Sequence, residues 1–93
     1  GEEFTVYLPH TNRTQALMLA ERVRQAVSSS EISTGASGRT VQVTISMGVL
    51  AVEESNPDRI DDPKEYLREL FSRVDAALYR AKNGGRNRIV AAD

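Results

Sequence analysis

Gly1-Glu2-Glu3-Phe4-Thr5-Val6-Tyr7-Leu8 is the stretch around which the rest of this chain is organised. Apolar side chains at Phe4, Val6 and Leu8 alternate with other residues, which is the period-two pattern of a half-buried β-strand. The glycine and the two carboxylates in front of the strand are typical of a turn. The stretch therefore predicts a strand that begins directly after an acidic turn.

The two adjacent glutamates of this turn, Glu2 and Glu3, are candidate ligands of a divalent cation. Neighbouring carboxylates repel each other, and a hard ion such as Mg²⁺ relieves the repulsion while it keeps coordination positions open for phosphate. An ordinary solvated surface is the alternative interpretation, because exposure is the default for glutamate. The other end of the chain bears on this choice.

Composition limits the classes of protein that this chain can represent. The 93 residues suffice for one small domain, and 12 basic against 13 acidic residues give a formal net charge of −1. This balance indicates neither a nucleic-acid nor a membrane partner. The absence of cysteine excludes disulfides and thiolate chemistry, and it is compatible with a reducing cytoplasm. No apolar run approaches the roughly 18 residues of a membrane span, and Gly1 indicates a piece of a longer protein.

Two helices are predicted from apolar spacing and capping residues. Thr11 or Asn12 is the predicted N-cap of the first helix, and Gln15 would complete a capping box with Asn12. Asp62-Pro63-Lys64-Glu65 is a strong start signal for the second helix, which Asn83-Gly84-Gly85 ends. Apolar residues recur at helical spacing in both segments, so each helix is expected to pack one face against a core rather than to bind a cofactor.

The remaining segments are predicted to be two further strands and two loops. Residues 41–52 alternate between apolar and polar side chains up to Gly48, which indicates a bend or a close approach by another backbone. Residues 86–92 resume an extended pattern, whereas residues 28–38 and 53–62 lack periodicity and are expected to be loops. The predicted order is therefore strand, helix, strand, helix, strand.

Basic residues gather around the end of the second predicted helix, at Arg80, Lys82, Arg86 and Arg88. Basic side chains at this position complement the helix dipole, but four of them exceed that need. Lys82 lies in the last predicted turn and Arg86 directly after two glycines, so both can reach one anion. A polyphosphate, bound by this pair and by a metal on the acidic turn, is the candidate ligand.

Five segments of the chain, in order and at matching spacing, are similar to the motifs of one protein family. The motifs are GG(D/E)EF, LPxT, AERIR, VTxSxG and ADxALYxAKxxGRN, and the segments that resemble them are Gly1-Glu2-Glu3-Phe4, Leu8-Pro9-His10-Thr11, Ala20-Glu21-Arg22-Val23-Arg24, Val43-Thr44-Ile45-Ser46-Met47-Gly48-Val49, and Val74-Asp75-Ala76-Ala77-Leu78-Tyr79-Arg80-Ala81-Lys82 followed by Gly85-Arg86-Asn87. The family is the diguanylate cyclase, or GGDEF, domain, and the resemblance runs from Gly1 to about Val90.

The resemblance implies a fold and an activity. The expected fold is an α/β (α+β) palm like that of the class III nucleotide cyclases, of which this chain would supply a β-α-β-α-β part of a helix-covered sheet. The implied reaction condenses two GTP molecules into cyclic di-GMP with Mg²⁺ or Mn²⁺, in a transient homodimer whose domains each hold one GTP. An upstream sensory domain is implied as well, and so is a cytoplasmic location, where GTP is found.

The resemblance also assigns roles by position. Glu2 and Glu3 would be the catalytic and metal-binding acidic residues, and Glu2 would also help to deprotonate the 3′-hydroxyl. Lys82 and Arg86 would hold the terminal phosphates. Arg22 matches an arginine that joins a product-inhibition site in some members, and an exposed helix charge is an equally good interpretation of it.

The sequence departs from the family at its start. The first glycine of the signature and roughly the first half of the domain are absent, so residues 1–93 correspond to the C-terminal portion of one GGDEF domain and are expected to be inactive alone. Two alternatives to a cyclase remain. One is a catalytically silent module that binds GTP or cyclic di-GMP, or that only dimerises. The other is a nucleic-acid-binding domain, which the scarcity of aromatic residues and the negative net charge disfavour.

Overall fold

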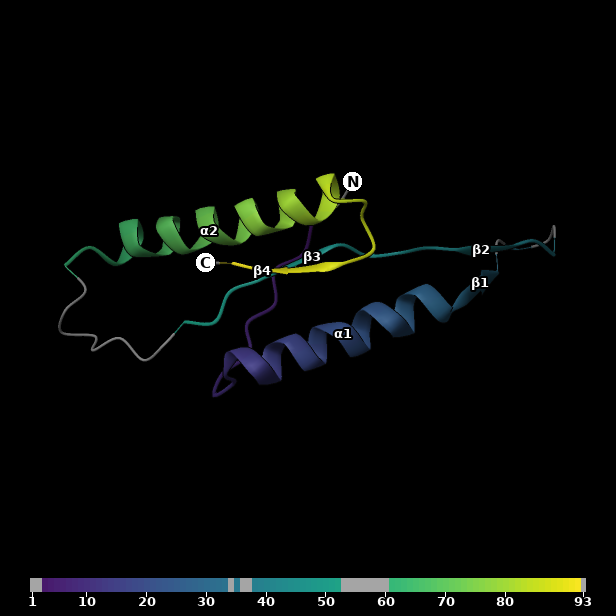
Figure 1. Cartoon of the computed structure of the whole chain (residues 1–93), viewed down its shortest axis with the longest axis horizontal. Coiled ribbons are helices and arrows are strands. Elements are labelled where there is room, and N and C mark those ends of the chain that lie inside the picture. The colour runs from purple at the N-terminus through teal and green to yellow at the C-terminus, as the bar shows by residue number, and fades with distance from the viewer. Residues whose placement is uncertain (1–2, 34, 36–37, 53–60, 93) are drawn as a thin grey trace.

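The structure is a computed structural model that describes residues 3–33, 35, 38–52 and 61–92. A short parallel strand pair lies between two helices, and a β-hairpin extends away from the end of the first helix (Figure 1). In chain order the described elements are α1 (Arg13–Ser29), β1 (Glu31–Ser33), β2 (Thr40–Gln42), β3 (Met47–Val49), α2 (Pro63–Asn83) and β4 (Ile89–Ala91). The mixture of helix and strand agrees with the expected α/β class.

Helix α1 begins at the predicted capping box. The Asn12 side chain accepts a hydrogen bond from the Gln15 backbone N–H at 2.8 Å, and the Asn12 backbone N–H donates to Gln15 Oε1 at 3.0 Å. These two bonds satisfy backbone donors that a helix N-terminus leaves without partners. Ala20 is buried in this helix, which contacts both β3 and β4. The choice between Thr11 and Asn12 is thus settled in favour of Asn12.

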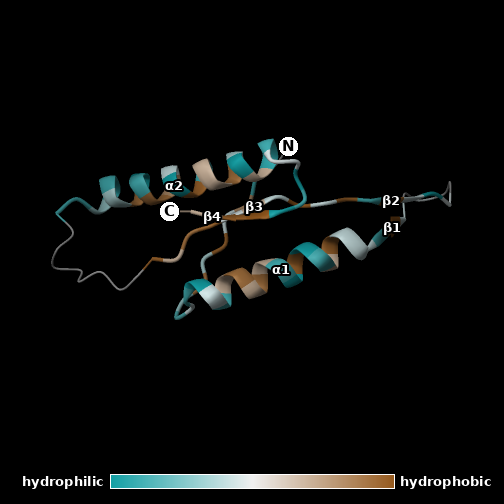
Figure 2. Ribbon diagram, viewed as in Figure 1, coloured by the Kyte–Doolittle hydropathy of each residue, from teal (hydrophilic) through white to brown (hydrophobic). Residues whose placement is uncertain are grey.

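Helix α2 also begins where its capping residues predict. Asp62 Oδ1 accepts from the backbone N–H groups of Lys64 at 3.1 Å and Glu65 at 3.3 Å, and Pro63 occupies the first turn. Apolar residues of α2 face β3 and β4 (Figure 2), as the apolar spacing predicts. Within the part of the chain that the structure describes, neither helix combines the length and apolar character that crossing a bilayer requires.

Gly48 lets β3 lie close against α2. Strands β3 and β4 pair in parallel with the register Met47↔Ile89, Gly48↔Val90 and Val49↔Ala91. A Cβ atom on Gly48 would lie 2.7 Å from both the Leu78 nitrogen and the Val74 oxygen, which is too close for any side chain. This confirms the close backbone approach predicted at that glycine. The buried core residues among the described ones are small as well, namely Ala20, Ala77, Ala81 and Ala92.

The prediction for residues 28–52 is partly wrong. Helix α1 continues to Ser29, and the segment expected to be a loop contains β1, which pairs antiparallel with β2. Residues 43–46, which connect β2 to β3, were expected to continue a strand but belong to no β-ladder. Strand β1 is Glu-Ile-Ser, with one apolar residue and all three side chains exposed. Three such residues carry no periodic signal, so this strand is defined by its partner alone.

The predicted first strand is not found among the described residues 3–8. These residues form no β-ladder, although their apolar side chains alternate. Phe4, Val6 and Tyr7 are 83%, 75% and 86% exposed. A strand needs a neighbour that accepts and donates its backbone hydrogen bonds, and no described segment takes that position. Of the predicted loop 53–62, residues 53–60 lie outside the described part of the chain, as do Gly1 and Glu2 of the acidic turn.

Candidate functional site

The acidic start of the chain meets the basic end of α2. Lys82 Nζ donates a hydrogen bond to Glu3 Oε1 at 3.0 Å, although 79 positions separate the two residues. The segment 3–8 brings Glu3 there by running from the start of α1 past the strands to the end of α2 (Figure 1). Both side chains remain accessible, with 36% of Lys82 and 57% of Glu3 exposed. Glu2, the other candidate acid, lies outside the described residues.

A hollow of about 220 Å³ adjoins this ion pair. Its lining consists of Glu3, Asp75, Leu78, Tyr79 and Lys82. Asp75 was not predicted from the sequence as a site residue. It lies seven residues before Lys82, which places both residues on one face of α2, and that spacing is the signal that could have revealed it.

The donor set around the hollow suits a hard cation in part. Glu3 and Asp75 supply carboxylate oxygens, the ligand type that Mg²⁺ takes in proteins. Among the described residues no group of three or more acidic, histidine or cysteine side chains gathers at one point. Such a pair of carboxylates fits an ion that completes its coordination with water and phosphate oxygens, as Mg²⁺ usually does.

The loop after α2 places Arg86 at the same helix end as Lys82. Helix α2 closes with Gly84, and Gly85 has a φ angle of 122° that side-chain-bearing residues rarely adopt. The Arg86 backbone N–H then donates to the Ala81 carbonyl oxygen at 3.0 Å, which turns the chain back over the last helical turn. The predicted helix stop is confirmed, with Gly84 as the C-cap and Gly85 as the first residue with a positive φ angle. Lys82 and Arg86 therefore belong to the same end of the helix.

A second polar contact reaches this loop from α1. Arg24 Nη1 donates to Asn87 Oδ1 at 2.9 Å, and Arg24 Nε donates to Glu21 Oε2, also at 2.9 Å. The hydrogen bond from Arg24 lowers the pKa of Glu21 from its usual 4.5, and the bond to Glu21 raises the pKa of Arg24. Both groups are thus charged at neutral pH. The spacing of Glu21 and Arg24 predicts their contact, but nothing in the sequence indicates the bond to Asn87.

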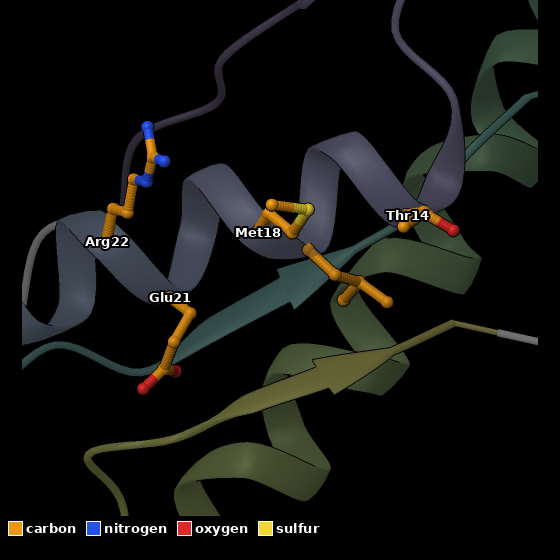
Figure 3. A pocket seen from close by; sticks show the side chains of 5 residues that line it. Thr14, Met18, Glu21 and Arg22 are labelled. Carbon is orange, nitrogen blue, oxygen red and sulfur yellow. The ribbon is translucent and has the colours of Figure 1, made fainter.

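Arg22, the candidate for an inhibitory site, lies on α1. It lines an open hollow of about 430 Å³ together with Thr14, Leu17, Met18 and Glu21. Figure 3 shows Arg22 and Glu21 extending from different sides of the helix. The Lys82–Glu3 hollow has a different lining, so Arg22 does not share a hollow with Glu3 or Lys82.

Comparison with known proteins gives one family and several relatives. Residues 1–88 match the family described as diguanylate cyclase, GGDEF domain. The chain is 47% identical over 92 residues to diguanylate cyclase DgcM of Escherichia coli (strain K12) and 39% identical over 90 residues to response regulator PleD of Caulobacter vibrioides. It is 38% identical over 89 residues to diguanylate cyclase A of Treponema denticola.

These alignments cover the chain far better than they cover the relatives. They include 99%, 97% and 96% of this chain, but 19%, 18% and 21% of the three relatives in the same order. The chain therefore spans about a fifth of the length of the relatives that it matches.

Proposed function

Because the chain belongs to the GGDEF family of diguanylate cyclases, we propose that residues 1–93 are the C-terminal portion of one cyclase domain, whose parent protein condenses two GTP molecules into cyclic di-GMP. The observation that carries this proposal is the contact between Lys82 and Glu3, since it joins an acidic and a basic group at one accessible hollow. A nucleoside triphosphate with its metal needs both kinds of group within reach.

The acidic residues are proposed to hold the metal. Glu2 and Glu3 would bind Mg²⁺ or Mn²⁺, and Asp75 lines the same hollow as Glu3. When bound, the ion supplies positive charge to the phosphates and polarises the phosphorus that is attacked. Glu2 is further proposed to accept the proton of the 3′-hydroxyl.

The basic residues are proposed to hold the terminal phosphates. Lys82 offers a compact ammonium with three donors, of which Glu3 takes one in the structure. A phosphate oxygen can therefore bind Lys82 without complete loss of the ion pair. Arg86 offers a planar fork that binds two phosphate oxygens at once. Together they favour binding of the triphosphate and departure of pyrophosphate.

The reaction itself requires two such domains. In each new phosphodiester bond, the 3′-oxygen of one nucleotide attacks the α-phosphorus of the other, the hydroxyl proton passes to a base, and pyrophosphate leaves. The proposed partners are therefore GTP and a second copy of the domain, under the control of an upstream sensory domain. The proposed location is the cytoplasm, where GTP is available.

The 93 residues alone are proposed to lack cyclase activity. Phe4, Val6 and Tyr7 are exposed, and the segment 3–8 has the alternation of a strand but no ladder within the described residues. Its ladder partner is proposed to come from the preceding part of the domain. A site with only part of its sheet in place would not hold the metal and both ends of the nucleotide in a reactive arrangement.

The test uses the parent protein, incubated with GTP and Mg²⁺, with cyclic di-GMP measured by chromatography. Wild-type protein is expected to form product, and Glu2→Ala and Lys82→Ala are expected to lose at least about 100-fold in rate, as for other groups that stabilise transition-state charge. Lys64→Ala, an exposed lysine at the other end of α2, is the matched control and should retain the rate. A folded, dimeric parent that binds GTP or cyclic di-GMP without forming product would support the silent binding module instead.

A further inference from the structure

Arg24 joins α1 to the loop that carries Arg86. Its Nη1 reaches Asn87 Oδ1 at 2.9 Å across 63 positions of sequence, while Glu21 accepts from its Nε at 2.9 Å. The Arg24 side chain is only 20% exposed. Because a guanidinium is planar and its donors form a rigid fork, binding by Glu21 on one edge fixes the direction in which the other edge points.

The loop that Arg24 reaches has an uncommon backbone. Arg86 and Asn87 have positive φ angles of 64° and 45°. Asparagine tolerates this left-handed region, whereas a long side chain such as arginine rarely occupies it. Such a conformation persists only where the surrounding structure holds it. The contacts around Arg86 therefore decide where its side chain points.

The loop is held by hydrogen bonds of its own and by bonds from neighbouring elements. The Arg86 N–H donates to the Ala81 carbonyl at 3.0 Å, and Arg88 Nε donates to the Arg86 carbonyl at 3.1 Å. Both of these bonds stay within α2 and the loop itself. Two bonds tie the loop to other elements: the Met47 backbone N–H of β3 donates to the Arg88 carbonyl at 2.9 Å, and Arg24 of α1 donates to Asn87. Of these two, the bond from Arg24 is the one that reaches the residue directly after Arg86.

We propose that Arg24 is a positioning residue that acts through Asn87 to hold the left-handed backbone at Arg86, and so directs the Arg86 guanidinium to the phosphates of the nucleotide. The inference rests on the proposed function, in which Arg86 binds phosphate. Glu21 contributes to this positioning because it orients Arg24 through the hydrogen bond that Arg24 Nε donates to it.

The experiment measures the affinity of the parent protein for a non-hydrolysable GTP analogue with Mg²⁺, in a double-mutant cycle of Arg24→Gln and Arg86→Ala. Arg24→Gln alone should weaken binding about tenfold, the size expected for loss of one charged hydrogen bond. In the Arg86→Ala background, Arg24→Gln should weaken binding no further, because the residue that it positions is absent. A merely structural role for Arg24 would weaken binding equally in both backgrounds.

Two further variants make the cycle specific. Asn87→Gly keeps a residue that tolerates positive φ but removes the acceptor, so it should reproduce the loss seen in Arg24→Gln. Arg68→Gln is the matched control, since Arg68 forms the same type of ion pair with Glu65, three residues earlier on α2, but is 76% exposed. Arg68→Gln should leave the affinity unchanged.

Each outcome of the cycle bears on the proposal. Additive losses in the double variant would overturn the role of Arg24 and leave the proposed function intact. The same conclusion would follow if Arg24→Gln and Asn87→Gly kept wild-type affinity while Arg86→Ala bound weakly. Wild-type affinity in Arg86→Ala would overturn both the phosphate role of Arg86 and the positioning role built on it. Loss of binding in Arg24→Gln and Asn87→Gly that vanishes in the Arg86→Ala background would support the proposal.

Discussion

Lys82 Nζ lies 3.0 Å from Glu3 Oε1, so the first described residue of the chain and the last turn of α2 form one surface. The contact brings an acidic residue from the start of the chain against a basic residue near its end, 79 positions later. An ion pair this exposed contributes little to the free energy of unfolding, because water screens the attraction between its charges. The accessibility of both side chains suits a site where they exchange partners with a ligand.

Glu3→Gln should therefore separate stability from activity in the parent protein. Loss of the exposed ion pair is expected to change the free energy of unfolding by about 0–1 kcal/mol. Cyclase rate is expected to fall at least about tenfold, because a neutral amide binds a divalent cation less well than a carboxylate. Thermal unfolding and product formation are measured on the same preparation. An unchanged rate would contradict the metal role of Glu3. A rate that falls only as far as the fraction of folded protein falls would contradict it as well.

Gly48→Ala should destabilise the domain by about 3 kcal/mol, the upper end of the usual cost of overpacking. The added methyl group meets backbone atoms of Val74 and Leu78 at 2.7 Å, and backbone atoms cannot rotate away as side chains do. Thermal unfolding of the parent protein measures the effect. Gly38→Ala is the control, because its Cβ would have nothing within 4 Å and its φ of 67° adds only a backbone cost of about 1 kcal/mol. An equal shift in both variants would refute the packing argument.

Features that depend on local chemistry were predictable from the sequence. Asn12 with Gln15 and Asp62 with Pro63 begin the helices as predicted, because a cap is satisfied within a few residues. The close approach at Gly48 was also predictable, since a glycine within a strand usually marks a bend or a neighbouring backbone that leaves no room for a side chain. The basic cluster predicted an anionic ligand for Lys82, but it did not predict the direct contact with Glu3.

Features that depend on a distant partner were not predictable. Strand β1 exists because β2 lies beside it, and its three residues carry no pattern of their own. Residues 3–8 have a strand pattern but no ladder among the described residues, since alternation along one segment does not supply the neighbouring strand that a ladder requires. The bond between Arg24 and Asn87 depends on how α1 and α2 are placed, which spacing along either segment does not contain.

Asp62→Ala should cost about 1 kcal/mol of stability, the usual value for loss of an N-cap. The Asp62 carboxylate accepts from the backbone N–H groups of Lys64 and Glu65, and alanine leaves both donors without it. The measurement is the denaturant midpoint of the parent protein, with helix content followed by circular dichroism. Asp61→Ala changes the neighbouring exposed carboxylate outside the helix and should have a smaller effect. Equal effects would indicate a general charge effect instead of a cap.

Glu21→Gln should lower stability at neutral pH, and the difference from wild type should disappear in acid. The hydrogen bond from Arg24 lowers the pKa of Glu21 in the folded state below its usual 4.5. A group with a depressed folded pKa contributes stability that is fully present above the unfolded pKa and is lost as pH falls through the folded one. The wild-type advantage should thus be constant from pH 7 to about pH 5.5 and shrink below about pH 4.5.

Denaturant unfolding of wild-type and Glu21→Gln protein across this pH range measures the effect. The same two proteins also test whether the loop that carries Arg86 depends on Glu21. If Glu21 orients Arg24, affinity for the GTP analogue at pH 7 should fall in Glu21→Gln as well, by less than in Arg24→Gln because glutamine still offers an oxygen acceptor. Glu65→Gln removes the exposed partner of Arg68 and should alter stability little at either pH. A wild-type advantage that persists unchanged below about pH 4 would show that the charge of Glu21 is not what Arg24 recognises.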